Sequence, residues 1–203
     1  MKAKTRDSYD SSASEYAANV AHLHPEKEGA AFIQALPNGG VILDLGCGSG
    51  RDAKIFSEMG LQVIGIDNAE QMIHIARQTA PKATFYTMDL EELDFLKASF
   101  DGIWANCSLV HVQKKKIPPL LSHLHQLLKP NGILFIAVKK GTGEVVEKDR
   151  RYGGLEKFWS YFEQDELENL LKTADFRVAN IVQAEPKHEH ETHTMLKTFA
   201  KKF

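Results

Sequence analysis

The chain has 203 residues, of which 43% are hydrophobic and 26% are charged, and its formal net charge is −2. This length and composition predict one globular domain with a full core and leave no room for a second domain of ordinary size. Lysine and arginine are spread along the chain, so no basic run indicates a nucleic-acid partner. The polar N-terminus and the lack of a long apolar stretch argue against a signal peptide and a membrane span. Two cysteines without metal spacing fit a reducing cytoplasm.

Helical patterns alternate with apolar, strand-like segments along most of the chain. Residues 5–36 are expected to be helical in two pieces, separated at Pro25, because proline is tolerated at a helix start but not inside a helix. The expected strands are residues 41–45, 62–66, 83–88, 102–106, 133–138, 178–182 and 195–200, and the expected helices between them are residues 52–59, 70–78, 118–129 and 165–174.

This alternation predicts βαβ units with right-handed crossovers and an α/β, doubly wound, mainly parallel sheet of Rossmann-like type. In such sheets ligands bind beyond the carboxyl ends of the strands. A polar stretch, residues 139–154, is longer than most connections, which indicates a binding loop. We therefore expect a single domain with a helical cap at about residues 1–36 and a substrate-side loop or lid at about residues 139–163.

A glycine-rich turn joins the first expected strand to its helix in the segment VILDLGCGSGRDA, residues 41–53. Gly48, Gly50 and Ala53 satisfy the dinucleotide fingerprint G-x-G-x-x-G/A, which places a pyrophosphate at the helix N-terminus. A glycine pattern alone is weak evidence, so the neighbouring residues decide which ligand the turn fits.

Three acids follow three successive strands. Asp44 ends the first strand, where a carboxylate would repel a pyrophosphate but would suit a ligand with an ammonium or sulfonium group. Asp67 lies about 20 residues further on, where a carboxylate takes a ribose diol. Asp89 follows the third strand and is suited to an exocyclic amine such as that of adenine. Together the acids indicate a cationic nucleoside without phosphate.

Five segments, in order, resemble the motifs of the class I S-adenosylmethionine-dependent methyltransferases. They are DLGCGSG (residues 44–50), VIGIDNAEQMIHIAR (63–77), YTMDLEEL (86–93), FDGIWANCSLVHV (100–112) and LLKPNGILFIAVKKGTGE (127–144). The resemblance covers roughly residues 9–176 and is closest to a small bacterial branch of tellurite-resistance-like and quinone-biosynthesis-like enzymes. It implies a seven-stranded, mostly parallel sheet with one reversed strand. It also implies S-adenosylmethionine as cofactor, S-adenosylhomocysteine as product and a small-molecule acceptor.

The resemblance also implies which residues hold the cofactor. Asp44 and the backbone of the glycine turn would hold the methionine part, Asp67 the ribose hydroxyls, and Asp89 the adenine. Tyr9 and Tyr16 match an N-terminal segment that closes over the cofactor. The implied cofactor-binding residues are Tyr9, Tyr16, Asp44, Gly46, Cys47, Gly48, Gly50, Arg51, Asp67, Asn68, Met72, Asp89, Leu90, Asn106, Cys107 and Ser108.

Methyl transfer from a sulfonium is an in-line displacement with an activated leaving group, so the protein mostly positions and desolvates the reactants. His111 is the candidate general base if the acceptor must lose a proton; the alternative is a histidine that packs under its loop. Tyr161 is the second candidate catalytic residue. The aromatic cluster FWSYF that contains it is either a wall of the acceptor pocket or a lid over it, or else ordinary core. Arg51 either pairs with the methionine carboxylate or is a solvated first-turn residue.

Other features argue against further chemistries. A nucleophilic Cys107 is disfavoured, because Asn106 stands where cytosine-C5 methyltransferases carry proline. The segment NCSL also departs from the Asn/Asp-Pro-Pro-aromatic motif of nucleic-acid exocyclic-amine methyltransferases. His188, His190 and His193 match no structural zinc spacing, so we expect a solvated loop and no metal. Two alternatives stay open: a cofactor-binding protein without catalysis, and a nicotinamide-dependent oxidoreductase.

Overall fold

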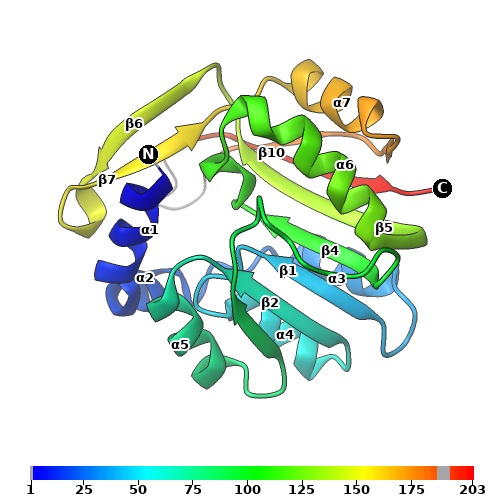
Figure 1. Ribbon diagram of the computed structural model, residues 1–203, viewed down its shortest axis with the longest axis horizontal. Helices are drawn as coiled ribbons and strands as arrows, with labels where there is room; N and C mark the ends of the chain where they lie inside the picture. Colours follow the sequence, from blue (N-terminus) through cyan, green and yellow to red (C-terminus); the bar gives the residue numbers. More distant parts are fainter. Residues whose placement is uncertain (1, 187–192) are drawn as a thin grey trace.

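A computed structural model describes residues 2–186 and 193–203. One twisted central sheet lies between two layers of helices (Figure 1). The α-helices are α1 (Lys2–Ser11), α2 (Ala13–Val20), α3 (Glu26–Gln34), α4 (Arg51–Glu58), α5 (Glu70–Thr79), α6 (Ile117–Leu127) and α7 (Gln164–Thr173). The strands are β1 (Val41–Leu45), β2 (Gln62–Asp67), β3 (Thr84–Thr87), β4 (Phe100–Asn106), β5 (Leu128–Lys139), β6 (Glu144–Asp149), β7 (Leu155–Ser160), β8 (Arg177–Val178), β9 (Val182–Ala184) and β10 (Met195–Lys201). The short 3-10 helices are η1 (Leu109–His111), η2 (Lys114–Lys116) and η3 (Arg150–Tyr152).

The main sheet has the strand order β3-β2-β1-β4-β5-β10-β8, with β9 also paired to β10. Strands β1 to β5 are parallel, whereas β10 runs antiparallel to β5. The predicted α/β fold with one reversed strand is therefore confirmed. One detail differs: the strand expected at residues 178–182 is two short segments, β8 and β9, so the sheet has eight strands rather than seven.

The two faces of the sheet follow from the alternation of side chains along each parallel strand. In β4, Trp104 packs toward α3 and α4, and its ring lies 4.0 Å from that of Phe135 in β5 and 5.0 Å from that of Phe56 in α4. The neighbouring Ile103 faces the other way, into the layer of α6 and α7. Both faces are covered, so the polar ends of the strands are where a ligand can reach the sheet.

The N-terminal segment forms three helices rather than two. Pro25 is the N-cap residue of α3, so the break expected there is confirmed, and a further break separates α1 from α2. Helices α1 and α2 pack against α5, and α1 also packs against β7, where the backbone N–H of Phe158 donates to the Thr5 hydroxyl at 2.9 Å. Figure 1 shows these helices beside β6 and β7.

The stretch expected to be a loop, residues 139–163, contains an antiparallel hairpin of β6 and β7. The sequence of β6, EVVEKD, is mostly exposed, so it lacks the alternation of apolar and polar residues that marks a half-buried strand. Its partner β7 carries Phe158 and Trp159, which are buried. Among the described residues, no helix combines the length and apolar character needed to cross a bilayer.

Candidate functional site

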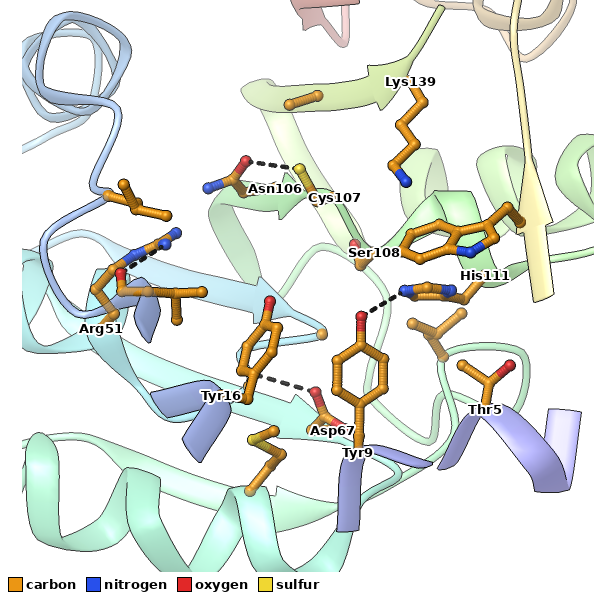
Figure 2. Close-up of a pocket in the computed structure, with 18 of the residues that line it drawn as sticks. Thr5, Tyr9, Tyr16, Arg51, Asp67, Asn106, Cys107, Ser108, His111 and Lys139 are labelled. Atoms are coloured by element: carbon orange, nitrogen blue, oxygen red, sulfur yellow. Dashed lines mark hydrogen bonds between the residues drawn. The ribbon is translucent and has the colours of Figure 1, made fainter. Parts of the chain in front are cut away.

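A cavity of about 280 Å³ lies at the carboxyl edge of β1, β2, β4 and β5, under α1, α2 and the hairpin (Figure 2). It is lined by many of the residues singled out from the sequence, namely Tyr9, Tyr16, Gly46, Gly48, Arg51, Asp67, Asn68, Met72, Leu90, Asn106, Cys107, Ser108 and His111. Trp159 of the FWSYF cluster and His193 also line it. Residues that the sequence did not indicate complete the wall, namely Thr5, Val20, Leu23, Pro25, Glu91, Ala137, Lys139, Tyr152, Met195 and Lys197.

Five predicted site residues do not line this cavity, namely Asp44, Cys47, Gly50, Asp89 and Tyr161. Asp44 and Cys47 are buried, and a side chain at Gly50 would meet the Cα of Ala76 at 2.9 Å. Gly50 thus serves the packing of α4 on α5. Asp89 borders a second hollow, which shares Asn68 with the main cavity.

Tyr161 does not line the cavity. It follows the end of β7, and its ring lies 5.1 Å from that of His193. Within FWSYF, the residue that lines the cavity is Trp159. Which residue of an aromatic cluster faces a cavity depends on where its strand ends, which the cluster itself does not encode.

The backbone of the glycine turn is bonded within the protein. The N–H groups of Gly46 and Cys47 both donate to the carbonyl of Ile66, at 2.9 Å and 2.8 Å. The N–H of Gly48, which has φ +53°, donates to Oδ2 of Asp67 at 3.0 Å. A dinucleotide pyrophosphate needs such N–H groups to point at it. Here they are used by a carbonyl and a carboxylate, so the turn is not a phosphate cradle.

Carboxylates surround this turn. Asp67 accepts a second hydrogen bond from the N–H of Ala69 at 2.9 Å, and burial raises its pKa. Asp44 is buried at the end of β1, and burial together with the neighbouring Asp52 raises its pKa. Oδ2 of Asp44 and the hydroxyl of Ser108 are buried and have no hydrogen-bond partner among the described residues. Ser108 lines the cavity, so a bound polar ligand would supply its missing partner.

Arg51 is fixed at the first turn of α4 rather than solvated. Its Nε and one terminal nitrogen donate to the carboxylate of Asp52 at 2.7 Å and 3.0 Å, and the other terminal nitrogen donates to the carbonyl of Val20 at 3.3 Å. The Arg51 side chain is 21% exposed, and the exposed part faces the cavity. The guanidinium is therefore held ready for an anionic group, as a methionine carboxylate would be.

His111 has a defined tautomer. Its Nδ1 lies 2.8 Å from the carbonyl of Phe158, which can only accept, so Nδ1 carries the proton. Its Nε2 accepts from the hydroxyl of Tyr9 at 3.0 Å, and both side chains line the cavity (Figure 2). Burial, with the cations of Lys157 and Lys139, lowers the pKa of His111 to about 4. The imidazole is thus neutral at neutral pH, with its lone pair on the side of the cavity.

Lys139, which the sequence did not single out, lies with Trp159 on the same wall of the cavity as His111. Nζ of Lys139, the last residue of β5, lies 3.3 Å above the centre of the Trp159 ring, and that ring lies 4.5 Å from the imidazole of His111. Figure 2 shows Lys139 reaching from the strand end toward this wall. A lysine at the end of a central strand was a possible signal, because such ends border the ligand site.

Among residues 2–186 and 193–203, no group of three or more histidines, cysteines or acids is placed to hold an ion. Of the three histidines expected in a solvated loop, His193 lines the cavity, whereas His188 and His190 lie outside the described residues.

The fold and the site define a class: a Rossmann-like protein whose strand ends carry carboxylates and a cavity, without a phosphate cradle. Comparisons with known proteins agree. The family described as "Methyltransferase domain" matches residues 42–132. An O-methyltransferase of Penicillium expansum, cnsE, is 32% identical over 152 residues, which cover 69% of this chain and 53% of the relative.

Two solved structures share the fold. A SAM-dependent methyltransferase of Methanosarcina mazei superimposes with a TM-score of 0.76 at 22% identity, covering 89% of this chain and 98% of the other. The 1,6-didemethyltoxoflavin-N1-methyltransferase of Burkholderia thailandensis was solved with 1,6-didemethyltoxoflavin and S-adenosylhomocysteine. It superimposes with a TM-score of 0.77 at 24% identity, covering 98% of this chain and 88% of the other. In sequence over residues 42–132 and in overall fold, the chain is similar to S-adenosylmethionine-dependent methyltransferases. It spans about half the length, or less, of the curated relatives it matches.

Proposed function

We propose that this protein binds S-adenosylmethionine and transfers its methyl group to a small-molecule acceptor. The observation that carries the proposal is the glycine turn, whose N–H groups are bonded internally while Asp67 presents a carboxylate to the cavity. Such a turn disfavours a dinucleotide pyrophosphate and suits a nucleoside with a cationic amino-acid part. The match of residues 42–132 to the methyltransferase domain family and the shared fold support the same ligand.

Bound S-adenosylmethionine would supply a methyl group on a sulfonium, which is already activated for displacement. The residues of the chain then have positioning roles. Asp67 would accept hydrogen bonds from the ribose hydroxyls, and Arg51 would pair with the methionine carboxylate. Tyr9 and Tyr16, whose rings meet edge to face at 5.1 Å, would cover the cofactor and exclude water. Neutral His111 would take a proton at Nε2 from an acceptor that displaces the Tyr9 hydroxyl.

The acceptor class is supported by the relatives. The Burkholderia neighbour was solved with a small heterocycle, and the curated relatives include an O-methyltransferase and a trans-aconitate 2-methyltransferase of Delftia acidovorans, 31% identical over 125 residues. The described lining includes no extended basic surface that would follow a nucleic-acid backbone. A cytoplasmic location belongs to this proposal, and it agrees with Cys47 and Cys107 both being free thiols.

The proposal is tested by turnover. Purified protein incubated with S-adenosylmethionine and a panel of small phenols, carboxylic acids, amines and thiols should release S-adenosylhomocysteine with at least one acceptor, measured by liquid chromatography. Binding of the cofactor with no turnover on any acceptor would favour the alternative of a cofactor-binding protein without catalysis.

Thermal unfolding separates the proposal from a nicotinamide-dependent oxidoreductase. S-adenosylhomocysteine at about 100 times its Kd adds about 2.7 kcal/mol of stability, which raises Tm by roughly 5–10 °C for a chain of this size. NADH should leave Tm unchanged. Protection by NADH, and none by S-adenosylmethionine or S-adenosylhomocysteine, would overturn the proposed function.

A pH profile tests the role of His111. Because its pKa lies at about 4, the imidazole loses its proton well below neutrality, and the acid limb of kcat/KM should fall near pH 4 instead of near the ordinary histidine value of about 6.5. His111→Gln should lower kcat by about 10²- to 10⁴-fold and remove that limb. S-adenosylhomocysteine affinity should change little. An acid limb near pH 6.5, or an unchanged rate in His111→Gln, would show that His111 is not the base.

A further inference from the structure

A buried carboxylate that the proposed chemistry does not use, Asp52, lies beneath one end of the cavity. Its side chain is 6% exposed and accepts five hydrogen bonds. Two come from Arg51, at 2.7 Å and 3.0 Å. The others come from Nδ1 of His24 at 3.0 Å, Nε1 of Trp104 at 2.8 Å and Nδ2 of Asn106 at 2.9 Å. Few buried acids join so many separate parts of a fold.

Asp52 is held in its charged form. Burial alone would raise its pKa, but the Arg51 guanidinium and the hydrogen bonds from His24, Arg51 and Asn106 hold that pKa well below its usual range. A charged acceptor makes stronger hydrogen bonds than a neutral one and fixes the direction of every donor around it.

Two of these donors belong to the wall of the cavity, since Arg51 and Asn106 both line it (Figure 2). Arg51 uses two of its five N–H donors on Asp52 and a third on the carbonyl of Val20. Two donors therefore remain for an anionic group in the cavity. Asp52 sets the direction of these two N–H groups, because it accepts two parallel hydrogen bonds from the same guanidinium.

The other contacts reach the N-terminal cover of the site. Val20 ends α2, and His24 lies in the link between α2 and α3, beside Leu23 and Pro25, which line the cavity. Gly29 leaves room for the His24 ring, since a Cβ at position 29 would lie 2.4 Å from Nε2 of His24. Through Arg51 and Asp52, the cover at residues 20–25 is thus attached to the same side chains that form the cavity wall.

We propose that Asp52 is a positioning residue that links the anion-binding edge of Arg51 to the docking of residues 20–25 over the cavity. The inference rests on the proposed function, in which the anion is the carboxylate of the methionine part of the cofactor. The carboxylate would bind to Arg51, which Asp52 already holds in place. Because Arg51 and Asp52 also hold Val20 and His24, docking of residues 20–25 and binding of the carboxylate strengthen each other.

The test compares two ligands by calorimetry. S-adenosylhomocysteine carries the amino-acid part, whereas 5′-methylthioadenosine keeps the adenosine and the sulfur but lacks the carboxylate. Asp52→Asn should weaken S-adenosylhomocysteine binding by about 10-fold or more while 5′-methylthioadenosine affinity changes less than about twofold. His24→Ala should show the same selectivity to a smaller extent. His24→Asn keeps an N–H donor near the Nδ1 position and should bind S-adenosylhomocysteine nearly as well as the wild type does. His22→Ala, at an exposed histidine of the same link, is the matched control and should bind both ligands as the wild type does.

Hydrogen exchange gives the second readout. S-adenosylhomocysteine should slow amide exchange across residues 13–25 in the wild type but not in Asp52→Asn, and 5′-methylthioadenosine should slow it in neither. An equal loss of affinity for both ligands, or full S-adenosylhomocysteine affinity in Asp52→Asn, would overturn the inference. If Asp52→Asn does not fold, the His24→Ala and His24→Asn pair decides by the same criteria. Failure of the wild type to bind S-adenosylhomocysteine would instead overturn the proposed function.

Discussion

Asp67→Ala is expected to weaken S-adenosylhomocysteine binding by about 100-fold or more. The carboxylate ends β2 and lines the cavity, where it would accept hydrogen bonds from both ribose hydroxyls. Each hydrogen bond to a charged acceptor is worth about 1.5–3 kcal/mol, so two of them correspond to at least a factor of about 100. Asp67 also accepts from the N–H of Gly48, so its loss additionally loosens the turn next to the ligand. Titration calorimetry measures the change directly.

The matched control is Glu92→Ala, which removes an exposed acid near the same edge of the sheet. It should bind S-adenosylhomocysteine as the wild type does. Asp67→Asn keeps an oxygen that accepts one hydrogen bond, so its affinity for S-adenosylhomocysteine should lie between those of the wild type and Asp67→Ala. Wild-type affinity in Asp67→Ala, with the fold intact by circular dichroism, would mean that the nucleoside does not lie at the end of β2.

Asp149→Ala is expected to lower the free energy of unfolding by about 3–5 kcal/mol, because it removes the carboxylate partner of a buried ammonium. Nζ of Lys157 lies 3.1 Å from Oδ2 of Asp149, and the two side chains are 0% and 4% exposed. The same ammonium lies 3.9 Å from the ring centre of Tyr9 and 4.6 Å from that of Tyr152. The pair therefore supports the hairpin and the tyrosines that line the cavity.

Denaturant unfolding checks this prediction with two comparisons. Glu156, also on the hairpin, pairs with Lys4 of α1, and the two side chains are 40% and 65% exposed. Glu156→Ala should therefore change stability far less than Asp149→Ala does. The double variant Asp149→Leu with Lys157→Met should recover most of the lost stability, because no buried charge is left. A loss below about 1 kcal/mol in Asp149→Ala would show that the carboxylate of Asp149 is not what stabilises the buried ammonium.

Much of the fold was predictable because its signals are local. The run ILFIAV, residues 133–138, is apolar throughout, as a strand covered on both faces must be, and it forms the buried part of β5. The hairpin was not predictable, because β6 has an exposed, charged sequence and is a strand through its pairing with β7. Pairing partners depend on contacts across the loop, which no local pattern records.

The site residues likewise divide into those with a local sequence signal and those whose role depends on distant parts of the chain. Asp67 was identified because its distance from the glycine turn is set by one βαβ unit. The role of Asp52 was not, because its partners Trp104 and Asn106 lie 52 and 54 residues away in the chain. Lys157 resembles a surface lysine in sequence, yet it is buried. The glycine turn matched a dinucleotide fingerprint, and only its hydrogen bonds show that the N–H groups are bonded within the protein.

Binding of S-adenosylmethionine at the carboxyl edge of the sheet is tested most directly by a crystal structure of the protein with S-adenosylhomocysteine. We expect density for the ligand in the cavity under Tyr9 and Tyr16, with the ribose hydroxyls on Asp67 and the amino-acid carboxylate on Arg51. A ligand bound elsewhere, or a ribose that does not contact Asp67, would contradict it.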